Sequence, residues 1–374
     1  MAIPTLFWLV GSSNNIILQQ QIRRSKITAM SQTVPKIITR ALGKNGPQIP
    51  RLGLGLMGLS GHYGLPAPDE ERLAFLDKAY EMGERYWDTA DMYGDCEDLL
   101  GKWFAANPGK RENIFLSTKF GIQVQGRSIK VDSSPEYCRQ AVEKSLKRLG
   151  LPFVDLLYVH HLDKVTPIEK TIQVMVELKN EGKIHHLGLS ECSADTLRRA
   201  SAIHPIAAVQ MEYNPFSVEI ESPERRFLET SRELGIAVVA YSPLGRGLLT
   251  GSISSKEDLT KAGDIRTMLP RFNDENLEKN LAVVAKISEI AKTKGVTPTQ
   301  LALAWVLAQG DDIFAIPGTT KAHRLSENLG AMSISLTAEE EQAIRNVGKE
   351  VFGARIHDKV PGVNIFGDTP PLEA

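Results

Sequence analysis

Three apolar runs in the sequence end in, or are closely followed by, four polar side chains. Together these four side chains could protonate and stabilise a developing oxyanion. Asp88 ends the run in WDTADMYGD and Tyr93 follows it, while Lys119 ends LSTKF and His160 ends DLLYVHHLD. Each of these side chains alone has an ordinary structural explanation. An Asp at the end of a strand is typical of a turn, a Lys there is typically a solvated charge at the edge of the sheet, and a His there is typically a polar group whose hydrogen bonds are satisfied. An acid, a phenol, an ammonium and an imidazole at one rim would instead suit the reduction of a carbonyl group.

That chemistry assigns a role to each side chain. Hydride arriving at a carbonyl carbon leaves negative charge on oxygen, which a positioned acid must protonate. A free tyrosine has a pKa of about 10, which is too high for efficient proton transfer at neutral pH, and a neighbouring ammonium lowers it. We therefore expect Tyr93 to donate the proton, Lys119 to lower its pKa, Asp88 to hold Lys119, and His160 to donate a hydrogen bond to the carbonyl oxygen.

The elements that must position these residues alternate in type from residue 51 onward. We expect eight strands, at 51–57, 85–88, 114–119, 154–160, 185–190, 207–211, 236–240 and 313–316. We expect helices at 69–82, 97–106, 134–149, 167–181, 194–203, 223–234, 277–294, 298–309 and 321–331. Three helix starts carry a hydroxyl at the cap and proline at the first helical position, namely Ser134 with Pro135, Thr166 with Pro167, and Thr297 with Pro298.

This alternation predicts an α/β fold with a parallel sheet covered by helices. Eight units without a linker favour a single (β/α)8 TIM barrel, and an open doubly wound sheet is the alternative. In a barrel the carboxyl ends of the strands share one rim, which is where active sites lie. The four candidate side chains are therefore expected at one mouth.

A glycine pattern near the start invites a different interpretation. Gly53, Gly55 and Gly58 match the G-x-G-x-x-G dinucleotide fingerprint, which requires a helix to open directly after it. Pro66 and Pro68 follow, so that no helix is expected before about residue 69. We expect these glycines to shape the first strand and its loop instead.

Composition limits the classes of partner. The chain has 374 residues, 42% of them hydrophobic and 24% charged, with a formal net charge of -1. No apolar stretch reaches the roughly 18 residues of a membrane span, and no basic field would attract nucleic acid. The three cysteines, Cys96, Cys138 and Cys192, are odd in number without C-x-x-C spacing, which argues against a disulfide framework or a zinc site and favours a reducing, cytoplasmic location.

The N-terminal segment has a charge bias of its own. The first acidic residue is Asp69, and seven basic residues precede it. That bias is typical of a mitochondrial transit peptide, but Met30 favours a dispensable or disordered extension over residues 1–29. We expect an extension at 1–35, the barrel at 36–350 and a C-terminal tail near the cofactor and substrate mouth at 351–374.

The motifs together resemble the aldo-keto reductase superfamily over residues 36–350. DTADMYG, STKF and YVHHLD resemble its Asp, Tyr, Lys and His tetrad, and GLMGLSGHYG and IPGTT are most similar to its pyridoxal-reductase and potassium-channel-β-like branch. HHLGLSEC, AVQMEYNP and YSPLGRGLLTG resemble its nicotinamide-contacting segments, and IPGTTKAHRLSENLGA its adenosine-phosphate segment. The cofactor contacts implied by the resemblance are Ser190, Gln210, Tyr241, Ser242, Leu244, Gly247, Ile316, Gly318, Thr320, Lys321, Arg324, Glu327 and Asn328.

The resemblance implies a cofactor, a plug and a substrate pocket. NADPH/NADP+ would lie extended across the barrel rim. An N-terminal β-hairpin with Asn45 and Gly46 as its turn would close the barrel floor. Tyr63, Trp87 and Phe120 are expected to line a pocket for flat or apolar carbonyl compounds.

Two positions depart from what the resemblance leads us to expect. Glu191 follows Ser190, where many relatives carry Asn, so that one contact to the nicotinamide carboxamide is in doubt. His160 and His161 form a doublet, and strand alternation would send their rings to opposite sides. The spacing of the family motif selects His160 as the ring that faces the cofactor.

The function expected is NADPH-dependent reduction of a small-molecule aldehyde or ketone. The alternative is a cofactor-binding regulatory β-subunit-like sensor with little turnover, because channel β-subunits share this fold. A dehydratase or isomerase on the same barrel is a third possibility.

Overall fold

The sheet runs in chain order, and its first and last strands meet. The computed structural model describes residues 37–125, 128–356 and 364–373, so the extension expected at 1–35 lies outside them. The eight parallel strands are β3 (Leu54–Gly55), β4 (Tyr86–Asp88), β5 (Phe115–Phe120), β8 (Val154–Val159), β9 (Ile184–Ser190), β10 (Ala208–Glu212), β11 (Ala237–Tyr241) and β12 (Ile313–Ala315). Parallel bridges join Leu52 to Ala315 and Gly55 to Gly318. The TIM barrel is confirmed, and the open sheet is not.

Barrel closure explains the first glycines. The Gly53 amide donates to the Ala315 carbonyl at 2.8 Å. A Cβ atom on Gly55 would lie 2.7 Å from the Ile316 carbonyl oxygen, and one on Gly53 would lie 2.4 Å from the Tyr86 ring. A side chain at either position would hold the strands apart. Only a 3-10 turn, η1 (Met57–Ser60), lies between these glycines and the next helix, which begins at Asp69, so the dinucleotide fingerprint is a coincidence of sequence.

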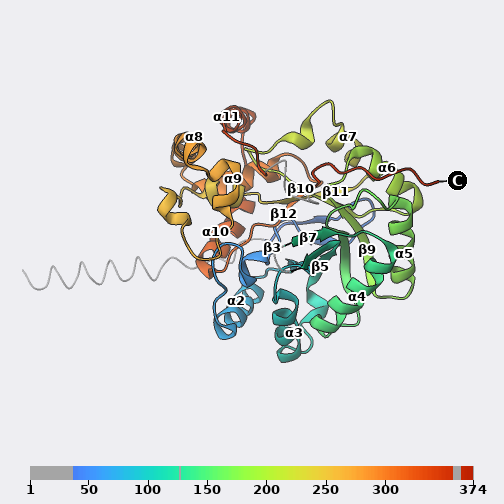
Figure 1. Ribbon diagram of the computed structural model, residues 1–374. Coiled ribbons are helices and arrows are strands. Elements are labelled where there is room, and N and C mark those ends of the chain that lie inside the picture. The colour runs from blue at the N-terminus through green and yellow to red at the C-terminus, as the bar shows by residue number, and fades with distance from the viewer. Residues whose placement is uncertain (1–36, 126–127, 357–363, 374) are drawn as a thin grey trace, which may run out of the picture. The chain divides into compact units, whose positions relative to one another are not determined.

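Helices surround the strands (Figure 1). They are α2 (Asp69–Glu81), α3 (Cys96–Ala106), α4 (Pro135–Leu149), α5 (Ile168–Asn180), α6 (Ala194–Ile203), α7 (Phe227–Leu234), α8 (Asp274–Lys294), α9 (Pro298–Ala308), α10 (Ala322–Gly330) and α11 (Ala338–Gly348). Short 3-10 turns are η2 (Arg111–Asn113), η3 (Glu219–Glu221), η4 (Gly245–Thr250), η5 (Lys256–Leu259), η6 (Arg266–Met268), η7 (Pro270–Phe272) and η8 (Ala331–Ser333). No helix within the described ranges has the length and hydrophobicity needed to span a bilayer.

The helix starts follow the sequence signals in most places. Ser134 and Thr297 cap α4 and α9 through their side chains. Thr166 does not cap α5, because its hydroxyl donates instead to Asp163 at 2.8 Å, and the helix begins at Ile168. Helix α11 was not predicted, although Thr337 forms a capping box with Glu340 there.

Two antiparallel hairpins complete the fold. Strands β1 (Thr39–Ala41) and β2 (Gln48–Pro50) pair. The buried Leu42, just after β1, and Ile49, within β2, belong to the apolar cluster inside the barrel, with Tyr86, Tyr158 and Phe314 among its members. The expected plug is therefore present. Its turn spans residues 43–46, closed by a hydrogen bond from the Gly46 amide to the Gly43 carbonyl at 3.2 Å. The second hairpin, β6 (Ile122–Gln125) with β7 (Ser128–Val131), was not predicted.

Candidate active site

A cavity of about 1240 Å³ opens where the strands end. Its walls include Asp88, Tyr93 and His160, and every one of the cofactor contacts expected from the sequence. These residues come from segments spread between β4 and α10, and the barrel gathers them because all its strands point toward the same rim. Lys119 is fully buried next to Asp88.

The Lys119 ammonium is held by two oxygen atoms. It pairs with Asp88 Oδ1 and donates to the Thr89 carbonyl at 2.8 Å. The other carboxylate oxygen of Asp88 accepts from Ser117 Oγ at 2.7 Å and from Gln210 Nε2 at 3.0 Å. Burial works against the charge on Lys119, but Asp88 and Tyr93 outweigh it, so the pKa of Lys119 is raised. Lys119 therefore stays cationic at neutral pH.

Tyr93 lies against this cation. Lys119 Nζ is 5.0 Å from the centroid of the Tyr93 ring. Burial raises the pKa of Tyr93, and the nearby Lys119 opposes that rise without cancelling it. The lysine thus acts in the expected direction, but the expectation of a lowered pKa is wrong for the protein alone, because removing the phenolate from water costs more than the cation returns.

His160 completes the group as a neutral ring. Its ring lies edge-on to Tyr93, with centroids 5.9 Å apart. Burial, followed by the charges of Lys119 and His161, lowers the pKa of His160 well below its ordinary value. Its Nδ1 atom is buried without a hydrogen-bond partner among the described residues. A neutral imidazole retains one N–H donor, which fits a hydrogen bond to a carbonyl oxygen.

The two histidines do not point to opposite sides. Their rings are stacked, with centroids 5.6 Å apart and planes 15° apart, and both line the cavity. Strand β8 ends at Val159, so the alternation of a strand no longer applies to the doublet. His161 Nδ1 lies 3.2 Å from the carbonyl oxygen of Asn364.

The part of the cavity wall at the start of α10 suits a phosphate. Helix α10 has no side-chain cap at its N-terminus, and Lys321 and Arg324 are exposed there on the cavity wall. Within the described residues neither cation has a carboxylate partner, unlike most arginines of this chain. Free N–H groups at a helix start and two unpaired cations form an anion site. The residues present therefore fit a dinucleotide that carries an additional phosphate.

The aromatic lining of the cavity differs from the expected one. Tyr63 lines the cavity, but Trp87 and Phe120 do not. Trp87 packs against Trp103 with ring centroids 4.8 Å apart, and Phe120 packs near Tyr137. Trp87 is adjacent in sequence to Asp88, and Phe120 is adjacent to Lys119. Because successive side chains of a strand point to opposite faces, both aromatic side chains point toward the helices. Apolar side chains that do line the cavity include Met57, Leu65, Ile122, Ile129, Ile265, Ile356 and Ile365.

Several charged residues of the wall were missed by sequence reasoning, and three of them bear on the C-terminal tail. Glu212, Arg246 and Arg355 line the cavity. Arg246 stands inside the glycine-rich segment already assigned to the cofactor, which was an available signal. Glu212 is the last residue of β10 and lies two positions after Gln210, which was assigned to the cofactor. Arg355 lies in the C-terminal tail, where no periodicity or motif marks it.

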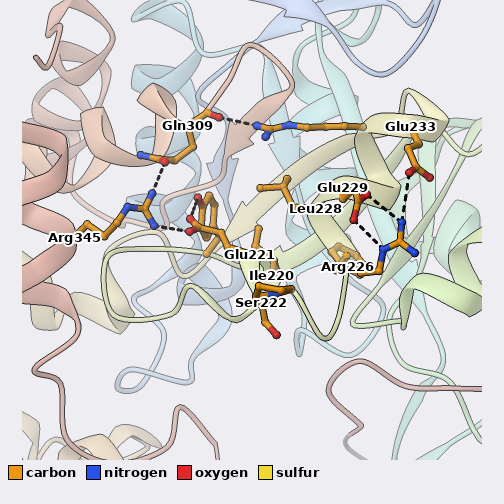
Figure 2. Close-up of a pocket in the computed structure, with 13 residues that line it drawn as sticks. Ile220, Glu221, Ser222, Arg226, Leu228, Glu229, Glu233, Gln309 and Arg345 are labelled. Carbon is orange, nitrogen blue, oxygen red and sulfur yellow. Dashed lines mark hydrogen bonds and ion pairs between the residues drawn. The ribbon is translucent and has the colours of Figure 1, made fainter. Parts of the chain in front are cut away.

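A second cavity, of about 710 Å³, lies between α7 and the region of Gln309 and Arg345 (Figure 2). Its charged groups are all held in ion pairs. Arg226 binds Glu229, and Arg345 binds Glu221. Such neutralised pairs leave little field for a ligand, so the first cavity is the candidate active site.

Comparisons with known proteins agree with this site. The sequence model of the Aldo/keto reductase family matches residues 51–349. The chain is 48% identical to aldo-keto reductase str7 of Strobilurus tenacellus, over 83% of this chain and 92% of that protein. It is 45% identical to aldo-keto reductase yakc [NADP(+)] of Schizosaccharomyces pombe, over 90% of this chain and 99% of that protein.

Solved structures give the same result. The glycerol dehydrogenase AKR11B4 from Gluconobacter oxydans superposes with a TM-score of 0.73 at 29% identity, covering 84% of this chain and 95% of that one. The thermostable aldo-keto reductase Tm1743 superposes with a TM-score of 0.66 at 29% identity, covering 83% of this chain and all of that one. The barrel, its plug, the strand-end residues and these relatives lead to one conclusion: the chain belongs to the aldo-keto reductase family.

Proposed function

We propose that this oxidoreductase uses NADPH to reduce apolar aldehydes or ketones to alcohols, with Tyr93 as the proton donor. The observation that carries the proposal is the single cavity in which Tyr93, packed against the buried Lys119, meets His160 and the predicted cofactor contacts. Carbonyl reduction requires, at one rim, a proton donor, a cation that stabilises the conjugate base of that donor, and a neutral hydrogen-bond donor.

Each protein group has a defined task. NADPH, when bound, supplies the hydride. His160 donates a hydrogen bond to the carbonyl oxygen and orients it toward Tyr93. The Tyr93 O–H bond breaks as the new O–H bond of the alcohol forms, and the phenolate left behind is stabilised by Lys119. Asp88 keeps Lys119 charged and in place, and solvent returns the proton to Tyr93.

The apolar wall defines the substrate class. Burying one methylene group contributes about 0.8 kcal/mol, or roughly fourfold in affinity. The test is a panel of aldehydes followed by the loss of NADPH absorbance. KM should fall as the alkyl chain lengthens from propanal to octanal, and a KM independent of chain length would contradict an apolar substrate.

The sensor alternative is not favoured. Both curated relatives are named as aldo-keto reductases. The same aldehyde panel separates the two functions, because a sensor would retain cofactor tightly and turn over almost nothing.

Arg324→Ala should weaken NADPH binding and leave NADH binding nearly unchanged. Arg324 and Lys321 stand at the start of α10, where they suit the 2′-phosphate that only NADPH carries. The loss should be about 1.5 to 3 kcal/mol, the range for a hydrogen bond to a charged group. Quenching of tryptophan fluorescence measures both dissociation constants. Arg139→Ala, on α4 outside the cavity, is the matched control, and equal losses for both cofactors would refute the assignment.

His160→Ala should impair turnover more than His161→Ala. His160 contacts Tyr93, whereas His161 contacts the Asn364 carbonyl. We expect His160→Ala to lower kcat by about tenfold or more, as loss of a hydrogen-bond donor to the reacting oxygen should, and His161→Ala to act mainly on KM. Steady-state kinetics on both variants decide, and the reverse order would assign the donor role to His161.

The domain limits and the cellular location are part of the proposal. We assign the barrel to residues 36–350 and the tail to 351–374. The three cysteines are free and buried, which supports a cytoplasmic location, while the basic start of the sequence supports the mitochondrial alternative. Incubation of the full chain with isolated mitochondria should give neither import nor cleavage. Cleavage near Arg24 would reverse the assignment.

A further inference from the structure

Glu191 occupies the position after Ser190 where a contact to the nicotinamide carboxamide was in doubt. Its carboxylate is buried and fully engaged by the protein. Oε1 accepts from Arg355 Nη1 at 2.8 Å and from the Tyr241 hydroxyl at 2.8 Å, and Oε2 accepts from Arg355 Nη2 at 2.9 Å. A carboxylate also has no N–H to offer a carboxamide oxygen. Glu191 is therefore committed to Arg355.

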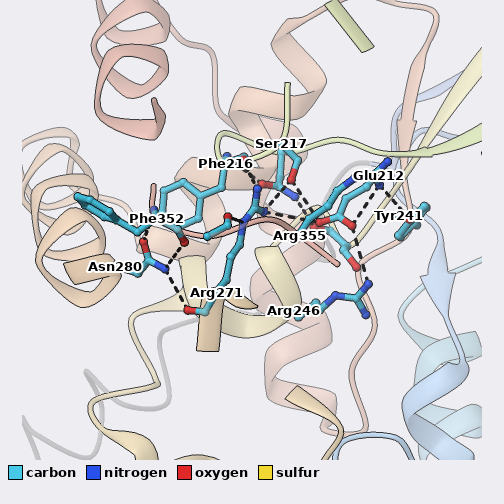
Figure 3. A network of polar contacts seen from close by, with 12 residues as sticks. Glu212, Phe216, Ser217, Tyr241, Arg246, Arg271, Asn280, Phe352 and Arg355 are labelled. Carbon is cyan, nitrogen blue, oxygen red and sulfur yellow. Dashed lines mark hydrogen bonds and ion pairs between the residues drawn. The ribbon is translucent and has the colours of Figure 1, made fainter. Parts of the chain in front are cut away.

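Arg355 belongs to a buried network of positively and negatively charged side chains (Figure 3). It also reaches Glu212 at 3.3 Å, and Glu212 lies 3.8 Å from both Arg246 and Arg271. Removing Arg355 alone would leave Glu191 as an uncompensated buried charge, whereas removing Glu191 would still leave Glu212 beside Arg355. Arg271 in turn donates to the Gly353 carbonyl at 3.2 Å, which holds the chain just before Arg355.

The backbone of Glu191 holds a second part of the C-terminal tail. The Gly367 amide donates to the Glu191 carbonyl at 2.7 Å, and the Gly367 carbonyl accepts from the Ser193 amide at 2.9 Å. The His161 contact to Asn364 adds to this attachment. Both described parts of the tail, residues 351–356 and 364–373, thus meet at Glu191.

Each attachment sets an apolar side chain on the cavity wall. Ile356 directly follows Arg355, and Ile365 lies two residues before Gly367. We propose that Glu191 and Arg355 are positioning residues which hold the tail so that Ile356 and Ile365 form the part of the wall that selects apolar substrates. The selectivity part of this inference rests on the proposed function, and the positioning part does not.

Hydrogen exchange of the cofactor-free protein tests the positioning. In Arg355→Met, amides of peptides covering 364–373 should exchange about tenfold faster or more, because local opening becomes easier there, while those of β10 should not change. Unchanged exchange in 364–373 would overturn the proposal. If Arg355→Met does not fold, Glu191→Gln/Arg355→Met removes both charges together and serves for the same measurement.

Kinetics test the selectivity. Arg355→Met should raise the KM of octanal about fivefold or more relative to the KM of propanal, since buried methylenes lose their contacts. NADP+ is titrated on the same variant, because Arg355 also donates to the hydroxyl of Tyr241, a predicted cofactor contact, at 3.1 Å. A weakened NADP+ affinity with an unchanged octanal KM would assign the pair to the cofactor instead. Absence of octanal turnover in the parent would refute the proposed function, and hydrogen exchange would still decide the positioning.

Arg199→Met provides the matched control. Arg199 donates to the carbonyls of Thr369 and Pro370 at 2.8 and 2.7 Å, but it does not line the cavity. Its loss should speed exchange only near 369–373 and leave both KM values unchanged. An equal rise in octanal KM for Arg199→Met would show that any loosening of the tail has this effect, and the specific role of Glu191 and Arg355 would be wrong.

Discussion

Tyr93→Phe should lower kcat for aldehyde reduction by at least about a hundredfold, the usual contribution of a general acid. The change removes one hydroxyl and keeps the ring against Lys119 and His160. Because the proposed phosphate contacts, Lys321 and Arg324 at the start of α10, are not altered, the dissociation constant of NADPH should stay within a few-fold. Single-turnover kinetics together with fluorescence titration separate these two effects.

Near-normal reduction by Tyr93→Phe would show that another group donates the proton. His161 would be the next candidate, because it lines the cavity. Asp91 is a weaker one despite a pKa raised to about 7 by burial, with a further contribution from Glu97. Its carboxylate faces the Tyr137 hydroxyl at 3.3 Å, and it is not part of the cavity wall.

Lys119→Met should reduce kcat by a similar factor for a different reason. The phenol keeps its place but loses the cation that opposes the rise in its pKa, so it becomes a weaker acid. In the reverse direction, alcohol oxidation needs the phenolate, and its pH–rate profile should move to higher pH. An unmoved profile would contradict the role given to Lys119.

Two controls accompany Lys119→Met. The variant leaves Asp88 without its ammonium, so thermal unfolding must show that the barrel still folds. The double variant Tyr93→Phe/Lys119→Met should be hardly slower than either single variant, because residues that act as a unit are not additive. Multiplied losses in the double variant would mean that the two residues act independently.

The sequence by itself determined the barrel and the place of its chemistry. Strand-like runs alternate with helical ones, and a right-handed parallel arrangement of eight such units brings all strand ends to one rim. Asp88, Tyr93, Lys119 and His160 could therefore be grouped without coordinates. Lys321 and Arg324, which we propose bind the phosphate, were also selected from sequence, because side chains three positions apart on a helix can reach one anion.

Tertiary structure decided which way individual side chains face. Trp87 and Phe120 were expected in the pocket, but each neighbours an inward residue and so packs outward. The His160 and His161 rings face the same cavity because the strand ends before them. The alternation of side chains along a strand is predictable from sequence, but the residue at which the strand ends is not. An error of one residue in that end point reverses the face to which a side chain is assigned.

Tertiary structure also decided the electrostatics. The net rise in the pKa of Tyr93 depends on how completely neighbouring elements exclude water from it, and no local pattern encodes that. Glu191 and Arg355 are separated by 164 positions, and only the path of the tail brings them together. Local sequence fixes elements through short-range periodicity, whereas burial and long-range ion pairs depend on how those elements pack, which is why this part of the site could be learned only from the folded chain.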